Sequence, residues 1–196
     1  RSSSSRSSSS RSSSSPRHTS FGPTDVFVSP VAWSKHPSFA RDADVVSRLL
    51  SKGTIMCREE ITPFYIRSAL RDDEVAVWLV RDANERIFGF ALTKQHPTHV
   101  ELKLICTHRR NGEGTKLFDE ILAHTRSTQQ ELRLEAVNAK VALLYANAAR
   151  RAGHAVLLDD GSHHAHHNAP LAYETLKQTI RALELMIPMR FRPPSA

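Results

Sequence analysis

A glycine-containing turn at 109–115 (RRNGEGT) lies between a strand-like segment and a helix-like segment. An alternating apolar run at 100–106 precedes the turn, and an amphipathic run at 115–125 follows it. The first N–H groups of a helix have no intrahelical acceptor, and the helix dipole adds positive potential there. Glycine lets the backbone approach an anion closely and adopt positive φ. The turn therefore predicts an anion site, which we interpret as a diphosphate cradle.

Two common nucleotide-binding motifs do not fit this turn. Gly114 is followed by Thr115 and Lys116 rather than by a Lys-Ser/Thr pair, which disfavours a P-loop. The turn also lies in mid-chain and not after the first strand, and no acidic residue about twenty positions further on ends a second parallel strand. A dinucleotide-binding motif is therefore disfavoured as well.

The hydrophobic pattern before the turn predicts strands. Dense apolar runs at 75–80 and 87–92, joined by a turn-like segment at 82–85, predict an antiparallel hairpin. The next strand, at 100–106, alternates cleanly. Its apolar residues are predicted to share one side of the strand, and they are Val100, Leu102, Leu104 and Cys106.

The flanking segments complete an α/β layout with a mixed sheet. Pro188 places the last strand toward an edge of the sheet, because proline cannot donate to a strand ladder. Gly153 is a natural stop for the helix before it. The predicted elements are a strand at 26–28, helices at 44–52 and 59–71, a strand at 131–137, a helix at 138–152, a strand at 155–158, a helix at 170–181 and a strand at 183–189.

Three helices are predicted to bury an apolar stripe, because their apolar residues recur at helical spacing. Pro63 falls in the first turn of its helix, where proline is tolerated. The predicted stripes are Phe64, Ile66, Ala69 and Leu70 in the first, Leu117, Phe118, Ile121 and Leu122 in the second, and Val141, Leu144 and Ala148 in the third.

The motif Arg109-x-x-Gly112-x-Gly114 resembles the Arg/Gln-x-x-Gly-x-Gly/Ala signature of the GNAT family of acyl-CoA-dependent N-acetyltransferases. The strand before it lies where that family has its fourth strand. The resemblance covers residues 54–158 and implies a GNAT-like fold, with a mixed, mostly antiparallel central sheet flanked by helices. It also implies acetyl transfer from acetyl-CoA to a primary amine by direct attack in a ternary complex.

The segment after the turn extends the resemblance. Asn138 and Leu144-Tyr145 are similar to the family's Asn-x-x-Ala-x-x-Leu-Tyr segment, with Val141 in place of Ala, and Gly153-His154 is similar to its Gly-Phe. Tyr145 precedes Gly153 by eight residues, about one helical turn more than in the family. Counted back from Gly153, the family spacing would place the tyrosine at the position of Ala149 instead.

The resemblance also implies which residues bind and react. An N–H near Ile105 or Cys106 would stabilise the oxyanion. Glu101 is the candidate base and Glu135 the second choice, with a surface pair between Glu101 and Lys103 as the alternative. Tyr145 is the candidate acid, or else a core tyrosine. The implied CoA contacts are Leu104, Ile105, Cys106, Thr107, Arg109, Arg110, Asn111, Gly112, Glu113, Gly114, Thr115 and Asn138.

Residues 1–20 are predicted to form a disordered tail, and 21–196 a single domain. Three identical Arg-Ser-Ser-Ser-Ser repeats offer nothing apolar to bury. The arginines of this tail supply more than half of the formal charge of +7, so the domain itself is only mildly basic. The tail is either a low-complexity linker or an arm for RNA or acidic partners, tuned by phosphorylation.

Two other functions remain open: a non-catalytic acyl-CoA sensor, and an RNA- or chromatin-associated protein that acts through its tail. The acceptor is expected to be an amine of a small molecule or a protein, and the chain a monomer or homodimer. No apolar run reaches the roughly 20 residues needed to span a bilayer, and no secretory h-region is evident.

Cysteine and histidine usage adds two expectations. Two cysteines, Cys57 and Cys106, are predicted to be free thiols, which favours a reducing compartment, the cytoplasm or nucleus. Cys106 is expected to pack inertly and not to act as a nucleophile. No metal is expected. A histidine cluster is interpreted as a polar loop rather than a metal site, and it consists of His163, His164, His166 and His167.

Overall fold

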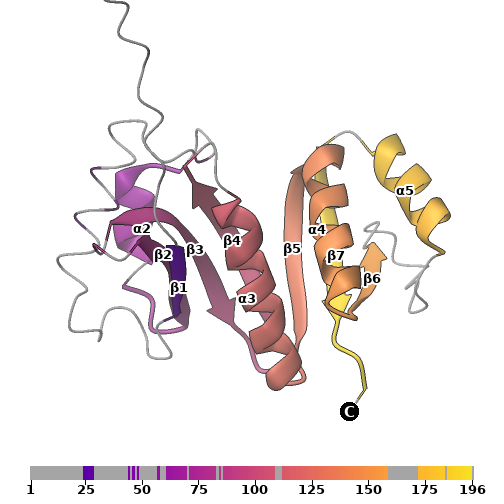
Figure 1. The fold of residues 1–196 in the computed structure, drawn as a ribbon, viewed down its shortest axis with the longest axis horizontal. Helices are drawn as coiled ribbons and strands as arrows, with labels where there is room; N and C mark the ends of the chain where they lie inside the picture. Colours follow the sequence, from indigo (N-terminus) through magenta and orange to yellow (C-terminus); the bar gives the residue numbers. More distant parts are fainter. Residues whose placement is uncertain are drawn as a thin grey trace, which may run out of the picture.

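The structure is a computed structural model (Figure 1). It describes residues 24–28, 44, 46, 48, 57, 61–69, 71–82, 84, 86–108, 112–158, 172–183 and 185–195. The predicted tail at 1–20 and the histidine loop at 163–167 lie outside the described residues. Of the predicted helix at 44–52, Asp44, Val46 and Arg48 are described, and all three are helical.

Seven strands form one sheet in the order β1-β2-β3-β4-β5-β7-β6. Every neighbouring pair in this described sheet is antiparallel except β4 and β5, which run parallel. The predicted mixed, mostly antiparallel sheet is therefore confirmed. The strands are β1 (Thr24–Val28), β2 (Val75–Asp82), β3 (Ile87–Gln95), β4 (His99–Thr107), β5 (Glu131–Asn138), β6 (Ala155–Leu158) and β7 (Leu185–Arg192).

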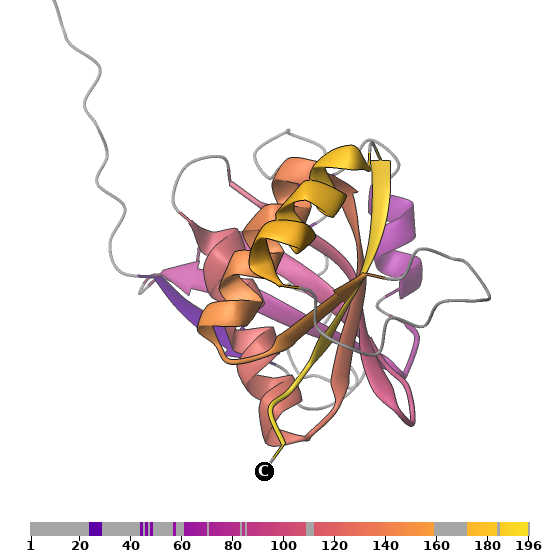
Figure 2. The same cartoon turned by 90° about the vertical axis from the view of Figure 1, so that its right-hand side faces the viewer.

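Helices lie on both sides of this sheet, as Figure 2 shows. On one side are α3 (Glu113–Ser127) and α4 (Ala139–Arg151), with α5 (Tyr173–Ala182) packed on α4. On the other side is α2 (Pro63–Ala69), which begins at its proline as the sequence predicts. Each side has its own buried apolar cluster.

The predicted apolar stripe of α3 is confirmed: its four members are at most 1% exposed. Two other stripe predictions were partly wrong. Phe64 of α2 is 81% exposed, because this seven-residue helix turns only Ile66 fully into the core. Leu144 of α4 is half exposed, and small side chains bring α4 against the sheet instead. They are Ala142, Ala146, Ala148 and Ala149.

Strand β4 does not keep its apolar residues on one side, contrary to the prediction. Leu92 of β3 pairs with Leu104 and Thr93 pairs with Leu102, so Lys103 is an extra residue with no partner in β3. Such a bulge changes the side on which the following residues lie. Val100 and Leu102 therefore pack on the α3–α4 side, whereas the later apolar residues, Leu104 and Cys106, pack on the α2 side.

The last strand, β7, is not at the edge of the sheet, which corrects a second prediction. It lies between β5 and β6. Its pairing with β6 begins at Met189, so Pro188 has a described neighbour on the β5 side only. The proline therefore lies where the pairing between β6 and β7 ends. Its missing N–H is tolerated at this point although β7 is an interior strand.

His154 follows the helix-ending Gly153, which has φ +83°, and it is only 4% exposed. Neither of its ring nitrogens has a hydrogen-bond partner. Burial lowers the pKa of His154 below its ordinary value of 6.5; the backbone of Ala152 acts in the opposite direction, and the charge of Arg126 adds to the lowering. The folded state therefore favours the neutral imidazole.

We expect the free energy of unfolding to fall as the pH drops below about 6.5, because the unfolded state then binds the proton more readily than His154 does. One such group changes stability by at most about 1.4 kcal/mol per pH unit. Urea unfolding at pH 7.5 and 5.5 should show a smaller difference for His154→Leu than for the wild type. An equal difference in both proteins would contradict this account.

Candidate functional site

The parallel strands β4 and β5 separate part of the way along their length. Residues 99–102 of β4 pair with residues 131–134 of β5, and no later pairs form between these two described strands. The separation begins at the extra residue Lys103, because a bulge bends its strand and increases the local twist. β4 and β5 therefore diverge toward their carboxyl ends (Figure 1).

A cavity of about 170 Å³ lies where the strands diverge, and we call it the splay cavity. Ile105 of β4 together with Val141 and Tyr145 of α4 line it from one side of the sheet, and Ile61 lines it from the other. Both sides of the sheet thus contribute to one cavity. An extended chain that lay here could take up the strand hydrogen bonds that β4 and β5 do not make with each other.

A larger cavity of about 500 Å³, the polar cavity, adjoins the splay cavity on the α2 side. Five residues line both cavities, which therefore adjoin each other: Ile61, Leu102, Lys103, Leu134 and Glu135. Glu135, the second-choice base, therefore lies where they meet. The other polar residues of the polar cavity are Tyr65, His99, Glu101, Arg133 and Arg190.

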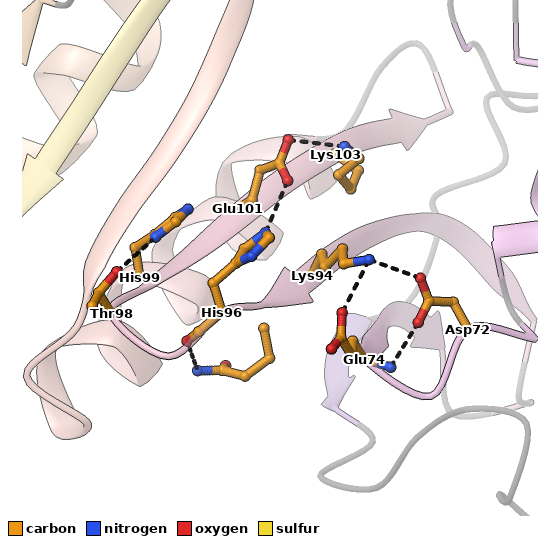
Figure 3. A network of polar contacts seen from close by, with 9 residues as sticks. Asp72, Glu74, Lys94, His96, Thr98, His99, Glu101 and Lys103 are labelled. Atoms are coloured by element: carbon orange, nitrogen blue, oxygen red, sulfur yellow. Dashed lines mark hydrogen bonds and ion pairs between the residues drawn. The ribbon is translucent and has the colours of Figure 1, made fainter.

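Glu101 is the centre of a polar network (Figure 3). Its Oε1 accepts from Lys103 Nζ at 2.8 Å, and its Oε2 lies 3.2 Å from His96 Nε2. Burial pushes the pKa of Glu101 upward, but the hydrogen bonds and charges of Lys103 and His96 outweigh it and hold the pKa below the ordinary value. Glu101 therefore both lines the cavity and forms the ion pair that the sequence offered as an alternative.

The ring of His96 stacks on His99, with centroids 4.4 Å apart. Burial lowers the pKa of His99, and the positive charge of Arg133 adds to this effect. The imidazole of His99 is therefore neutral at pH 7. It lines the polar cavity without adding a positive charge.

Tyr145 lines the splay cavity from α4, and its ring stacks on Phe118 at a centroid distance of 4.4 Å. Burial raises the pKa of Tyr145 to about 12, so the phenol stays protonated as a hydrogen-bond donor. α4 continues without interruption to Arg151, and Ala149 is fully buried in the core. The extra turn of helix therefore leaves Tyr145, and not position 149, at the cavity.

At the glycine turn, Gly112 caps α3 with φ +74°, a conformation that favours glycine. A Cβ built on Gly112 would meet no atom of the described residues within 4 Å. The N–H of Thr115 donates to the Gly112 carbonyl at 3.0 Å. A Cβ on Gly114 would lie 3.5 Å from Thr107, so the first turn of α3 packs closely on the end of β4. Three of the predicted CoA contacts lie outside the described residues: Arg109, Arg110 and Asn111.

Asn138 is the N-cap of α4, and its side-chain oxygen accepts from the N–H of Val141 at 3.0 Å. Such caps fix where a helix begins. This cap starts α4 directly at the end of β5, so that Val141 and Tyr145 reach the splay cavity. A contact between Asn138 and CoA remains a prediction.

Cys57 and Cys106 form a disulfide, which corrects the prediction of two free thiols. Both cysteines line the splay cavity. They are separated by 49 positions, yet their Cα atoms lie 4.8 Å apart, because tertiary packing brings residue 57 against the end of β4. Sequence spacing alone contains no signal for this contact. Cysteine usage therefore no longer indicates a reducing compartment.

Four residues that line the polar cavity were not predicted from the sequence: Tyr65, His99, Arg133 and Arg190. A signal existed for Arg133, since β5 alternates apolar residues with Glu131, Arg133 and Glu135. Charged residues on one side of an interior strand indicate a face that no helix fully covers. The pairing of Arg133 with Arg190 depends on the order of the strands in the sheet, which could not be predicted from the sequence.

Within the described ranges, no group of three or more His, Cys, Asp or Glu residues could hold a metal ion. In the same part of the chain, no helix is long and apolar enough to cross a bilayer.

Several solved structures that resemble this chain are N-acetyltransferases by their names. The chain matches Tetrahymena GCN5 at TM-score 0.54 and 12% identity, over 89% of this chain and 98% of that one. It matches the ribosomal-protein-S18-alanine N-acetyltransferase of Escherichia coli at TM-score 0.56 and 12% identity, over 88% and 97% of the two chains. It matches an N-acetyltransferase from Staphylococcus aureus Mu50 at TM-score 0.53 and 11% identity, over 88% of this chain and 97% of that one.

The fold of this chain is therefore the GNAT fold, as the glycine motif led us to expect. At these identities the likeness establishes the fold alone. No protein-family model matches the sequence, and a search of curated proteins found no match.

The disulfide gives a direct prediction. In protein purified without reductant and then unfolded, no thiol should react with a thiol reagent, whereas two per chain should react after reduction, one each from Cys57 and Cys106. Reduction should also lower the free energy of unfolding, by about 4 kcal/mol in a chain-entropy model for a loop of this length. Cys57→Ser should show no effect of reductant on stability. Two reactive thiols in the unreduced protein would contradict the disulfide.

Proposed function

We propose that this chain is an acetyl-CoA-dependent N-acetyltransferase, with residues 21–196 as its one catalytic domain. The observation that carries the proposal is the splay cavity, which passes between β4 and β5 and adjoins a polar cavity lined by Glu101. A thioester on one side of the sheet could thus meet an amine on the other. The GNAT fold of the chain supports the same chemistry.

The residues around the splay cavity suit an acyl-CoA. A pantetheine arm is extended and has amide groups, so it can pair with the unpaired edge of β4 at Leu104, Ile105, Cys106 and Thr107. The glycine turn at Gly112 suits a diphosphate, for which the donors would be the N–H groups of Glu113 and Gly114 at the start of α3. Acetyl-CoA would supply the activated acetyl group as a thioester.

Two of the chain's own side chains are proposed to move protons. Acetyl transfer forms an N–C bond and breaks a C–S bond, so the amine must lose a proton and the departing thiolate must gain one. Glu101 lines the polar cavity and is the proposed base, acting directly or through water. Tyr145 is the proposed acid, since its phenol is protonated at neutral pH and lines the splay cavity. An N–H at Ile105 or Cys106 is the proposed oxyanion donor.

A second candidate function is an acyl-CoA-binding module without catalysis. The observation in its favour is that Lys103 and His96 already engage Glu101 and hold its pKa low, which weakens it as a base. Catalysis would require the amine to approach within this network. The two candidates differ in whether CoA thiol is released when an amine is present.

We expect Glu101→Gln to lower kcat for CoA thiol release by about 10² to 10⁴-fold, because general-base catalysis typically contributes that much. Tyr145→Phe should also lower kcat, with acetyl-CoA affinity unchanged. The matched control is Glu74→Gln, which removes another lysine-paired carboxylate, 3.0 Å from Lys94 and outside both cavities. If acetyl-CoA raises the melting temperature but no amine releases thiol, the binding module is the better account.

The pH dependence of kcat/KM tests the role of Lys103. Removing its charge in Lys103→Met should raise the pKa of Glu101, because a cation near a carboxylate favours the charged form. The acidic limb of the pH profile should therefore move to higher pH. Lys94→Met, which disrupts the ion pairs with Asp72 and Glu74 instead, should leave that limb in place. An unshifted limb in Lys103→Met would show that Glu101 does not control it.

A further inference from the structure

The disulfide between Cys57 and Cys106 forms part of the wall of the splay cavity. Cys106 is the last of the cavity-lining residues in β4 and is only 1% exposed, whereas Cys57 is half-buried. The backbone of Cys106 belongs to the segment of β4 that we assign to the pantetheine arm. The disulfide therefore borders the space in which the reactive end of CoA is proposed to lie.

The splay cavity is too small for a whole cofactor. Its volume of about 170 Å³ is below the roughly 300 to 1,000 Å³ of pockets that enclose a drug-sized ligand. It can hold the end of an extended ligand, and that end then lies close to every wall of the cavity, including the disulfide. Most of the other lining residues are apolar, and the charged ones are Lys103 and Glu135.

The end of CoA is a thiol whenever CoA carries no acyl group. A thiolate attacks a disulfide sulfur directly and forms a mixed disulfide, at a rate that depends on its ionised fraction and on access to the sulfur. Cys57 is the more accessible of the two cysteines, since Cys106 is buried. The proposed acetyl transfer would release the CoA thiol inside the cavity, beside this disulfide.

We propose that Cys57 is a site of reversible modification by the thiol of CoA. The CoA thiolate attacks Sγ of Cys57, an S–S bond forms between CoA and Cys57, and the bond between Cys57 and Cys106 breaks. The electron pair of the broken bond stays on Sγ of Cys106, which then takes up a proton. No oxidant or reductant is consumed. This inference rests on the proposed function, because that function brings CoA into the splay cavity.

The modification stops acetyl transfer when free CoA accumulates. CoA attached to Cys57 fills the splay cavity, so acetyl-CoA cannot enter, and acetyl-CoA itself does not react because its sulfur is acylated. Burial makes the Cys106 thiolate a poor leaving group and keeps the Cys106 thiol protonated, so the exchange is slow in both directions. We therefore expect the mixed disulfide to form over about minutes to hours and to persist for long enough to be isolated.

Intact-protein mass spectrometry tests the modification directly. Protein purified without reductant is incubated with CoA at about pH 8, where a useful fraction of the thiol is ionised, and is then quenched with acid. The mass should rise by one whole CoA molecule, because the exchange adds CoA without loss of hydrogen, and one protein thiol should become titratable. Peptide mapping should place CoA on Cys57. CoA found on Cys106 alone would overturn the assignment of the site.

A second thiol distinguishes reaction of bound CoA from random collision. Glutathione at the same concentration should modify the protein at least about tenfold more slowly, because binding raises the effective concentration of the CoA thiol. Acetyl-CoA in excess should suppress the modification by CoA. Equal rates for the two thiols, or no protection by acetyl-CoA, would overturn the proposal.

Two variants of α4 connect the reaction to the splay cavity. Val141→Phe enlarges a side chain that lines the cavity. It should slow the modification by CoA at least about tenfold, because the effective concentration that binding supplies is lost. The matched control is Leu144→Phe, since Leu144 is half exposed and lines neither cavity, and it should keep the wild-type rate. Equal rates in the two variants would contradict a reaction inside the cavity.

The outcomes separate the modification from the function on which it rests. If amines release thiol from acetyl-CoA but CoA leaves the bond between Cys57 and Cys106 intact, the acetyltransferase stands and the modification is overturned. If no amine releases thiol, yet CoA modifies Cys57 faster than glutathione does and acetyl-CoA protects, the modification is supported in a CoA-binding module. Two titratable thiols in protein purified without reductant would overturn the proposal, since no disulfide would be present to react.

Discussion

The site depends on the extra residue in β4. Lys103 has no partner in β3, so the strand shifts by one position there and bends away from β5. The bulge separates the two strands, which creates the splay cavity. It also places Leu104 and Cys106 on the α2 side, where Cys106 meets Cys57. Without the bulge, β4 and β5 could continue their ladder, and their backbone groups would bond to each other instead of to a ligand.

The elements around the bulge are arranged to keep the opening in place. α3 packs on β4 with a fully buried apolar stripe. α4 comes close to the sheet through its alanines, and the Asn138 cap sets its start at the end of β5. Tyr145 is thereby held against Phe118 at the splay cavity. On the other side, the disulfide ties residue 57 to the end of β4. Rigid elements thus surround a cavity that the sheet itself leaves open.

Much of the fold could be predicted because its signals are local. The hairpin at β2–β3, the α3 stripe, the glycine turn that begins α3 and the stop at Gly153 are each determined by residues close in sequence. The bulge could not be predicted. Both faces of the sheet are covered, so an apolar residue such as Leu104 fits on either face. The alternation of apolar and polar residues therefore does not reveal that the strand changes sides. The position of β7 beside β5 depends on long-range pairing, and so does the disulfide.

Glu101 and Tyr145, which the strand and the motif indicated, line the two cavities, and their roles in a reaction remain predictions. Arg133 could have been found from the alternation of β5, whereas Arg190 looks like an ordinary surface cation within β7. Only the register shows that Arg133 lies between Glu101 and Arg190, in one row of charges across three strands. The row of charges lies beside the opening between β4 and β5.

A crystal structure with bound CoA would test the central claim most directly. On this account the pantetheine arm runs between the separated ends of β4 and β5, with its amides paired to the β4 backbone near Ile105 and its sulfur beside Tyr145. The diphosphate then lies at the turn that begins α3. A CoA molecule bound elsewhere, or β4 and β5 zipped together beyond Leu102 with the splay cavity closed, would contradict it.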